Sequence, residues 1–130
     1  MAVATPDQLT ISDVASDTGL TSHTLRYYER AGLLNGVGRN GSGHRRYTSA
    51  DVEWVVLVTR LRATGMPIRK IRRYAELVRA GEGNEAERVE ILESHRAEVV
   101  AKIAELEHNL ELIDYKLGLY RECVSRDSRA

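Results

Sequence analysis

A regular apolar repeat near the C-terminal end is the feature that most limits how this chain can fold. Its residues alternate by steps of four and three, a spacing that places them on one face of a helix and defines a coiled-coil seam. Looser matches at Val89 and Leu92 precede the repeat, and Arg96 interrupts it. Because one helix has nothing in its own chain to cover such a face, the sequence predicts a homodimer. The seam residues expected to hold the dimer are Val99, Ile103, Leu106, Leu110, Ile113, Leu117 and Tyr120.

The net charge changes sign at a glycine-rich linker, residues 81–84, that precedes this helix. Residues 1–80 contain 12 Lys and Arg against 7 Asp and Glu, a net charge of +5, whereas residues 81–130 contain 7 against 12, a net charge of −5. A basic N-terminal part favours an anionic partner for that part alone. We therefore expect a compact domain over residues 1–83, a dimerisation helix over residues 84–121 and a flexible tail over residues 122–130.

Neither a membrane helix nor a signal peptide is recognisable in the sequence. No apolar run approaches the roughly 20 residues that a membrane helix needs, and the N-terminus lacks a charged segment followed by an apolar one. A single cysteine, Cys123, cannot form an internal disulfide and suits a reducing compartment. We therefore expect a cytoplasmic protein with no membrane partner.

Two short helical patterns separated by Gly19 begin the compact domain. Thr10 and Asp13 predict a capped helix start, and Gly19 suits the left-handed backbone that ends a helix. Thr21 is placed to cap a second helix over Ser22 to Arg30. So short a glycine-containing turn between two helices is the helix-turn-helix pattern.

The second of these helices has one apolar face and one polar face. Leu25 and Tyr28 lie three residues apart and should pack on the first helix. The other side chains are suited to hydrogen bonds with base edges or phosphates, although the same residues would also serve as a solvated helix face. The residues expected to contact DNA here are Ser22, His23, Thr24, Arg26, Tyr27 and Arg30.

Glycines and asparagines are frequent in residues 35–47, NGVGRNGSGHRRY. This composition disfavours a helix and predicts a two-stranded ribbon with a tight turn near Asn40 and Gly41. The ribbon's cations suit a wing that contacts phosphates, but one of Arg45 and Arg46, together with Tyr47, would alternatively brace the ribbon against the domain. The residues expected to contact DNA from the wing are Arg39, His44, Arg45, Arg46 and Tyr47.

Two further helices should complete the compact domain. A capping pattern at Thr48 and Asp51 predicts the third, although residues 55–58 alone would also suit a buried strand. Pro67 suits the first turn of the fourth, over residues 68–80. The two apolar stripes are Trp54, Leu57, Val58 and Leu61, then Ile71, Tyr74, Ala75 and Val78. The cations beside the second stripe are either solvated surface or further DNA contacts: Arg69, Lys70, Arg72 and Arg73.

Several segments match a known pattern in their order and spacing: Thr10–Ala15, Gly19–Thr21, Thr24–Arg30, Gly32–Leu34, Arg39–Asn40, Gly43–Tyr47 and Leu61–Met66. Together they resemble the MerR family of bacterial transcription regulators. The resemblance continues to about residue 80, and the C-terminal heptads suit the family's dimerisation helix, so nearly the whole chain is covered. It implies a mainly α fold: a winged helix-turn-helix head with a small two-stranded wing, then a long C-terminal helix in an antiparallel coiled coil.

The resemblance also implies a function. A dimer of this family binds double-stranded promoter DNA whose spacer is too long for RNA polymerase, and a signal makes it kink and untwist that DNA, so it acts on the polymerase indirectly. Smooth bending costs about 1 to 6 kcal/mol, which phosphate contacts must offset. The alternative is an architectural or adaptor protein without an effector. Such a protein would bind many sites with a steep salt dependence, whereas a regulator protects a single palindrome.

No catalytic, cofactor or metal site is predicted. Some relatives sense metals through paired cysteines near the C-terminus, whereas this chain has only Cys123, and His95 and His108 lie 13 residues apart, too far to pair on one helix face. Cys123 is more simply an incidental thiol than a redox sensor. The pattern of residues names no small-molecule or redox effector, and we expect the protein not to be an enzyme.

Overall fold

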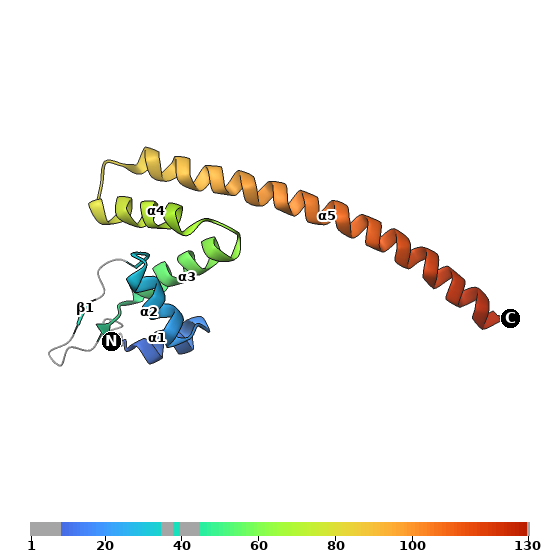
Figure 1. The fold of residues 1–130 in the computed structure, drawn as a ribbon, viewed down its shortest axis with the longest axis horizontal. Coiled ribbons are helices and arrows are strands. Elements are labelled where there is room, and N and C mark those ends of the chain that lie inside the picture. The colour runs from blue at the N-terminus through green and yellow to red at the C-terminus, as the bar shows by residue number, and fades with distance from the viewer. Residues whose placement is uncertain (1–8, 35–37, 40–44, 130) are drawn as a thin grey trace, which may run out of the picture. The chain divides into compact units, whose positions relative to one another are not determined.

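The computed structural model describes residues 9–34, 38–39 and 45–129. In chain order, the described residues form α1 (Ile11–Thr18), α2 (Ser22–Arg30), β1 (Gly38–Arg39), β2 (Arg45–Arg46), α3 (Ser49–Ala63), α4 (Ile68–Ala80) and α5 (Glu85–Arg129) (Figure 1). The fold is therefore mainly α, as expected. The chain divides into two compact units, Met1–Ile91 and Leu92–Ala130. The first unit includes the start of α5, so it extends past residue 83, where we expected the compact domain to end.

Side-chain caps set the ends of the first helices where the sequence predicts them. The Thr10 hydroxyl accepts the Asp13 amide at 3.1 Å, and the Asp13 carboxylate accepts the Thr10 amide at 2.9 Å. Gly19 ends α1 with φ of 75°, in the left-handed region that favours glycine. The Thr21 hydroxyl then accepts the Thr24 amide at 3.0 Å and begins α2. The helix-turn-helix pattern is thus confirmed down to its capping residues.

The core of the first unit lies where α1 packs on α2 and α3, and α3 packs on α4. Val55 is fully buried and Leu57 only partly, although the sequence predicts Leu57 in the buried stripe. The run over residues 55–58 is apolar all round, so the neighbouring helices decide which of its residues are buried. The buried apolar residues are Val14, Leu25, Tyr28, Leu33, Leu34, Tyr47, Val55, Val58, Leu61, Met66, Ile71, Ala75 and Leu77.

A short antiparallel pairing connects the parts of the chain on either side of the predicted ribbon turn. Gly38 pairs with Arg46 and Arg39 with Arg45. Next to β2, the Tyr47 amide donates to the Leu9 carbonyl at 2.8 Å, and the Leu9 amide donates back to Tyr47 at 3.0 Å. The predicted tight turn near Asn40 lies outside the described residues.

The last helix is longer than its predicted range of residues 84–121. Helix α5 has 45 residues, a length of about 67 Å at the usual rise. Its helical backbone continues through Arg129, so the expectation of a flexible tail over residues 122–130 is wrong as far as Arg129. No glycine or proline follows Gly118, and the Ser128 hydroxyl donates to the Val124 carbonyl at 3.1 Å, which supports the final turn. Among the described helices, none is both long enough and apolar enough to cross a membrane.

Candidate DNA interface

Helix α2 separates a buried face from an exposed cationic face. Leu25 and Tyr28 are 0% and 5% exposed, as expected for the face that packs on the core. His23, Arg26 and Arg30 are exposed on the same helix. Of the adjacent tyrosines, Tyr27 is the exposed one, at 36%. Of the residues expected to contact DNA from this helix, His23, Arg26, Tyr27 and Arg30 are therefore accessible to a partner.

The first turn of α2 combines capping with hydrogen-bonding groups at the surface. The Thr21 hydroxyl donates to the Thr24 hydroxyl oxygen at 3.0 Å and accepts the Thr24 amide. Because Thr24 accepts in the first of these bonds, its own proton remains for another acceptor, such as a phosphate oxygen. Ser22 and Thr24 are both partly buried. This turn also carries the positive end of the helix dipole, which favours an anion.

Arg46 lies close to α1. Hydrogen bonding from the Thr10 amide and then from the Thr10 side chain lowers the pKa of the Asp13 carboxyl, and the charge of Arg46 lowers it further. Arg46 is also partly buried. These observations support the bracing alternative for Arg46, in which its guanidinium faces the start of α1.

Tyr47 is a core residue, so the expectation that it contacts DNA is wrong. Its side chain is 0% exposed, and its main chain pairs with Leu9. It follows Arg46 directly in an extended segment, where successive side chains point to opposite faces, so one inward residue is expected beside a partly exposed one. Arg39 and Arg45 belong to the paired strands, whereas His44 lies outside the described residues.

Three side chains from α3 and α4 hold the turn that leads from α2 toward β1. The indole nitrogen of Trp54 donates to the Leu33 carbonyl at 2.6 Å, Arg72 Nε donates to the Ala31 carbonyl at 2.8 Å, and Arg79 Nη1 donates to the Leu34 carbonyl at 3.3 Å. All three carbonyls lie after Arg30, the last residue of α2, and so have no donor within that helix. The three bonds therefore hold the turn over residues 31–34.

No local sequence pattern predicts these three bonds, and the arginines of α4 suggest only surface positions or DNA contacts. The available signal was Gly32, whose φ of 76° places it in the left-handed region just after α2. A Cβ at this glycine would lie 3.6 Å from the Arg72 side chain, an ordinary contact distance. The Trp54 ring also stacks on Tyr74, with centroids 5.6 Å apart and planes at 6°. Trp54 thus serves both as a donor and as an apolar surface.

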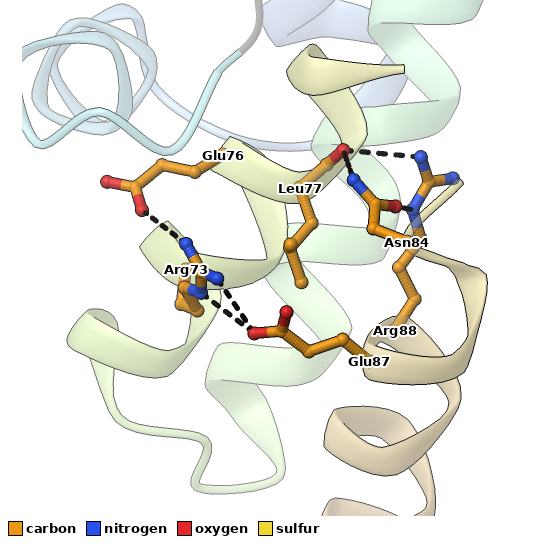
Figure 2. Close-up of polar contacts among 6 residues, drawn as sticks. All are labelled: Arg73, Glu76, Leu77, Asn84, Glu87 and Arg88. Carbon is orange, nitrogen blue, oxygen red and sulfur yellow. Dashed lines mark hydrogen bonds and ion pairs between the residues drawn. The ribbon is translucent and has the colours of Figure 1, made fainter. Parts of the chain in front are cut away.

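The cations of α4 divide into two groups. Arg72 is bonded to Ala31, and Arg73 binds the Glu87 carboxylate with Nε at 3.0 Å and Nη2 at 2.8 Å (Figure 2). The Glu87 carboxylate raises the pKa of Arg73. Arg69 and Lys70 are exposed at the start of the helix. Arg72 and Arg73 therefore make contacts within the protein, whereas Arg69 and Lys70 are simply exposed.

The described part of the chain contains no group of three or more His, Cys, Asp or Glu residues that could hold a metal ion. Cys123 is exposed on α5, where its sulfur accepts a hydrogen bond from Arg126 Nη2 at 3.5 Å.

The predicted seam residues of α5 are accessible. Val99 is partly buried, and the other six are between 41% and 64% exposed: Ile103, Leu106, Leu110, Ile113, Leu117 and Tyr120.

Two family models match the sequence. One, described as MerR HTH family regulatory protein, matches residues 9–77, and the other, described as MerR, DNA binding, matches residues 52–114. An uncharacterized HTH-type transcriptional regulator of Haemophilus influenzae is 38% identical over 119 residues, covering 92% of this chain and 88% of that protein. The HTH-type transcriptional regulator CueR of Salmonella typhimurium is 30% identical over 128 residues, covering 92% of this chain and 85% of that protein.

A solved structure agrees with these matches. The crystal structure of HiNmlR, described as a MerR family regulator lacking the sensor domain and bound to promoter DNA, superposes with a TM-score of 0.82 at 37% sequence identity. The similarity covers 88% of this chain and 91% of that one. The two family models together span residues 9–114, which include the helix-turn-helix and much of α5.

Proposed function

Because the chain belongs to the MerR family of helix-turn-helix regulatory proteins, we propose that it binds double-stranded promoter DNA as a homodimer and changes transcription by distorting that DNA. The observation that carries the proposal is the division of α2 into a buried Leu25 and Tyr28 face and an exposed cationic face. RNA polymerase is affected indirectly, through the altered spacing of the promoter elements. The site of action is the cytoplasm, on the nucleoid.

In this proposal, α2 is the recognition helix and lies in the major groove. His23 and Arg26 are one turn apart on its exposed face, where they donate to base edges or phosphates. Tyr27 and Arg30 contact the phosphate backbone, with Ser22 and Thr24 at the first turn. Trp54, Arg72 and Arg79 support these contacts from behind by holding the carbonyls that follow α2.

The paired strands β1 and β2 form the core of the proposed wing. Arg39 and Arg45 are partners in the strand register, and in this proposal both contact phosphates. His44, which lies outside the described residues, is proposed as a further contact. Arg46 is partly buried, and its charge contributes to lowering the pKa of Asp13, so we propose that it braces the wing against α1 and can still reach a phosphate with its exposed part.

Dimerisation is proposed to occur through the exposed seam of α5, and the charge of this helix favours an antiparallel pair. Residues 85–114 contain nine acidic and three basic side chains, whereas residues 115–129 contain two acidic and four basic ones. About the seam midpoint between residues 109 and 110, two antiparallel helices place the basic residues 115–129 of each beside residues 90–104 of the other, which contain three acidic and two basic side chains. A parallel pair would align like charges, which repel.

The orientation can be tested with the natural cysteine. The midpoint of the seam lies between Val99 and Tyr120, so two Cys123 thiols in an antiparallel pair would be about 40 Å apart at the usual helical rise. A short bismaleimide crosslinker should therefore give no covalent dimer from the native protein. Efficient crosslinking through Cys123 would instead show a parallel pair, with both thiols at the same end.

The function can be tested by footprinting the protein on DNA selected from a random duplex pool, with the selected site then placed in a promoter. We expect protection of one palindrome and a change in transcription that depends on spacer length. Binding at many unrelated sites with a steep salt dependence would instead indicate an architectural protein. No residue pattern in the described part of the chain identifies the activating signal. The genes next to the natural operator are therefore the best indication of what that signal is.

A further inference from the structure

Polar contacts fasten the start of α5 to the C-terminal end of α4 (Figure 2). The Asn84 amide nitrogen donates to the Leu77 carbonyl at 2.8 Å, and its amide oxygen accepts Arg88 Nε at 2.6 Å. Arg88 Nη2 donates to the same Leu77 carbonyl at 3.2 Å and to the Gly81 carbonyl. We call Asn84 and Arg88, with the carbonyls they bind, the α4–α5 clamp.

The clamp satisfies helix-end requirements on both sides of the linker. The last carbonyls of α4 accept no hydrogen bond from within their own helix, and they lie at the negative end of its dipole. A guanidinium at that position meets both needs, and hydrogen bonds from a charged group are stronger than neutral ones. The Asn84 carbonyl also accepts the Arg88 amide at 3.1 Å, so the clamp residues belong to the first turn of α5.

The two apolar residues of this first turn are largely exposed. Ala86 is exposed and Val89 is 52% exposed, while Arg88 is partly buried. The linker itself is permissive, because Gly81 and Gly83 have φ of 92° and 101° and a Cβ at either would meet no neighbouring atom within 4 Å. Burial increases only in the following turns, where Ile91 and Leu92 are partly buried and His95 is 8% exposed. In the first turn itself, the clamp supplies the fixed contacts with the end of α4.

A second contact, between Arg73 and Glu87, is more exposed than the clamp. Its two side chains are 52% and 45% exposed, and Arg73 also lies 3.6 Å from Glu76. Exposed ion pairs are screened by salt and hold geometry weakly. Arg88 differs because its donors reach main-chain carbonyls, whose positions are fixed by α4, and α4 is anchored in the core by Ile71 and Ala75.

We propose that Arg88, with Asn84, is a positioning residue: it fixes the first turn of α5 on α4 and thereby sets how strongly the dimer bends its DNA, without contacting DNA itself. The inference rests on the proposed function, in which α5 joins two heads. With a rigid joint, both heads bind only if the DNA bends to meet them. With a loosened joint, both heads bind DNA that is less distorted, so the free-energy cost of deforming the DNA is smaller.

The experiment uses the full-length dimer and a duplex selected by the wild-type protein, labelled at its two ends for energy transfer. Arg88→Met keeps the aliphatic stem and removes the donors. Arg62→Met, at an exposed arginine in the last turn of α3, is the control with the same change of charge. We expect Arg88→Met to remain dimeric and to bind within about threefold of wild type, while energy transfer in its complex falls toward that of free DNA.

A second measurement separates positioning from a general loss of structure. One base pair inserted between the half-sites rotates them by about 34° relative to each other. The insertion should weaken wild-type and Arg62→Met binding strongly and Arg88→Met binding much less, because a loose joint follows the rotation. Asn84→Ala removes the side-chain bond to the Leu77 carbonyl but keeps Arg88, so its loss of affinity on insertion should lie between those of wild type and Arg88→Met. If Arg88→Met does not fold, Asn84→Ala alone tests the positioning role.

The outcomes are distinguishable. If wild-type protein binds the selected duplex without bending it, the distortion in the proposed function is wrong, and the clamp cannot set its extent. If wild-type protein bends the duplex, and folded Arg88→Met or Asn84→Ala bends it equally and loses as much affinity on insertion, the positioning role is overturned while the proposed function stands. A reduced bend with a reduced insertion penalty supports the clamp.

Discussion

Replacing Trp54 by Phe should destabilise the DNA-binding unit by removing one hydrogen bond. The indole nitrogen donates to the Leu33 carbonyl at 2.6 Å in a partly buried setting. A phenyl ring preserves much of the stacking on Tyr74, 5.6 Å away between centroids, but leaves that carbonyl without its donor. A partly buried acceptor that loses its partner costs about 1 to 3 kcal/mol, more than the roughly 1 kcal/mol net value of an ordinary hydrogen bond.

Arg72→Met provides the matched comparison. Arg72 donates to the Ala31 carbonyl of the same turn, but this bond is exposed, so water replaces the lost donor. We expect its cost to be about 0.5 to 1.5 kcal/mol. The two variants therefore test whether burial of the carbonyl, and not merely the number of hydrogen bonds to the turn, determines the loss of stability.

Urea unfolding followed by far-UV circular dichroism measures both variants. Tryptophan fluorescence is unsuitable, because Trp54 is the single tryptophan of the chain. All samples need the same protein concentration, since the stability of the proposed dimer depends on it. A Trp54→Phe loss equal to or smaller than that of Arg72→Met would refute the reasoning. DNA affinity, measured well below the unfolding transition, should fall more for Trp54→Phe, because the turn after α2 is less well held.

Three further changes test other parts of the molecule. Arg26→Ala should weaken specific DNA binding by roughly 1 to 3 kcal/mol if the guanidinium reads a base edge, and unchanged affinity in an anisotropy titration would remove Arg26 from the interface. Leu110→Glu places a charge in the seam and should give monomers by size-exclusion chromatography; a surviving dimer would contradict the coiled-coil interpretation. Asp13→Asn should lower the unfolding midpoint near neutral pH. The folded-state pKa of Asp13 lies below its ordinary 3.8, so its stabilisation is present above that value and is lost as the pH falls through the folded-state pKa. The difference between wild type and Asp13→Asn should therefore shrink in acid, and a difference that stays constant with pH would exclude the carboxylate as its cause.

Local signals predict the helix ends and the two faces of α2 correctly. Thr10 with Asp13 and Thr48 with Asp51 form reciprocal caps within four consecutive residues, so their hydrogen bonds need no distant partner. Gly19 ends α1 for a similarly local reason, its left-handed backbone. The burial of Leu25 and Tyr28 follows from helical periodicity once α2 is placed against any core.

Interactions between distant segments account for the differences. Tyr47 has the same flanking pattern whether it points to DNA or to the core, and its pairing with Leu9, far along the chain, places it inside. Val55 is buried in preference to Leu57 because helices contact α3 from more than one side. The predicted end of α5 is too early because the heptad spacing of apolar residues stops after Tyr120, although no glycine or proline follows to end the helix.

The amino-acid sequence alone therefore specifies most of the helix starts, the buried and cationic faces of α2 and the apolar repeat of α5, because capping and periodicity act over a few neighbouring residues. The long-range contacts specify which arginines bind other parts of the protein. Arg72 and Arg79 hold the carbonyls after α2, Arg73 binds Glu87, and Arg88 joins α5 to α4. In sequence these side chains all look like surface cations, because a guanidinium's role depends on the acceptor that folding brings within reach.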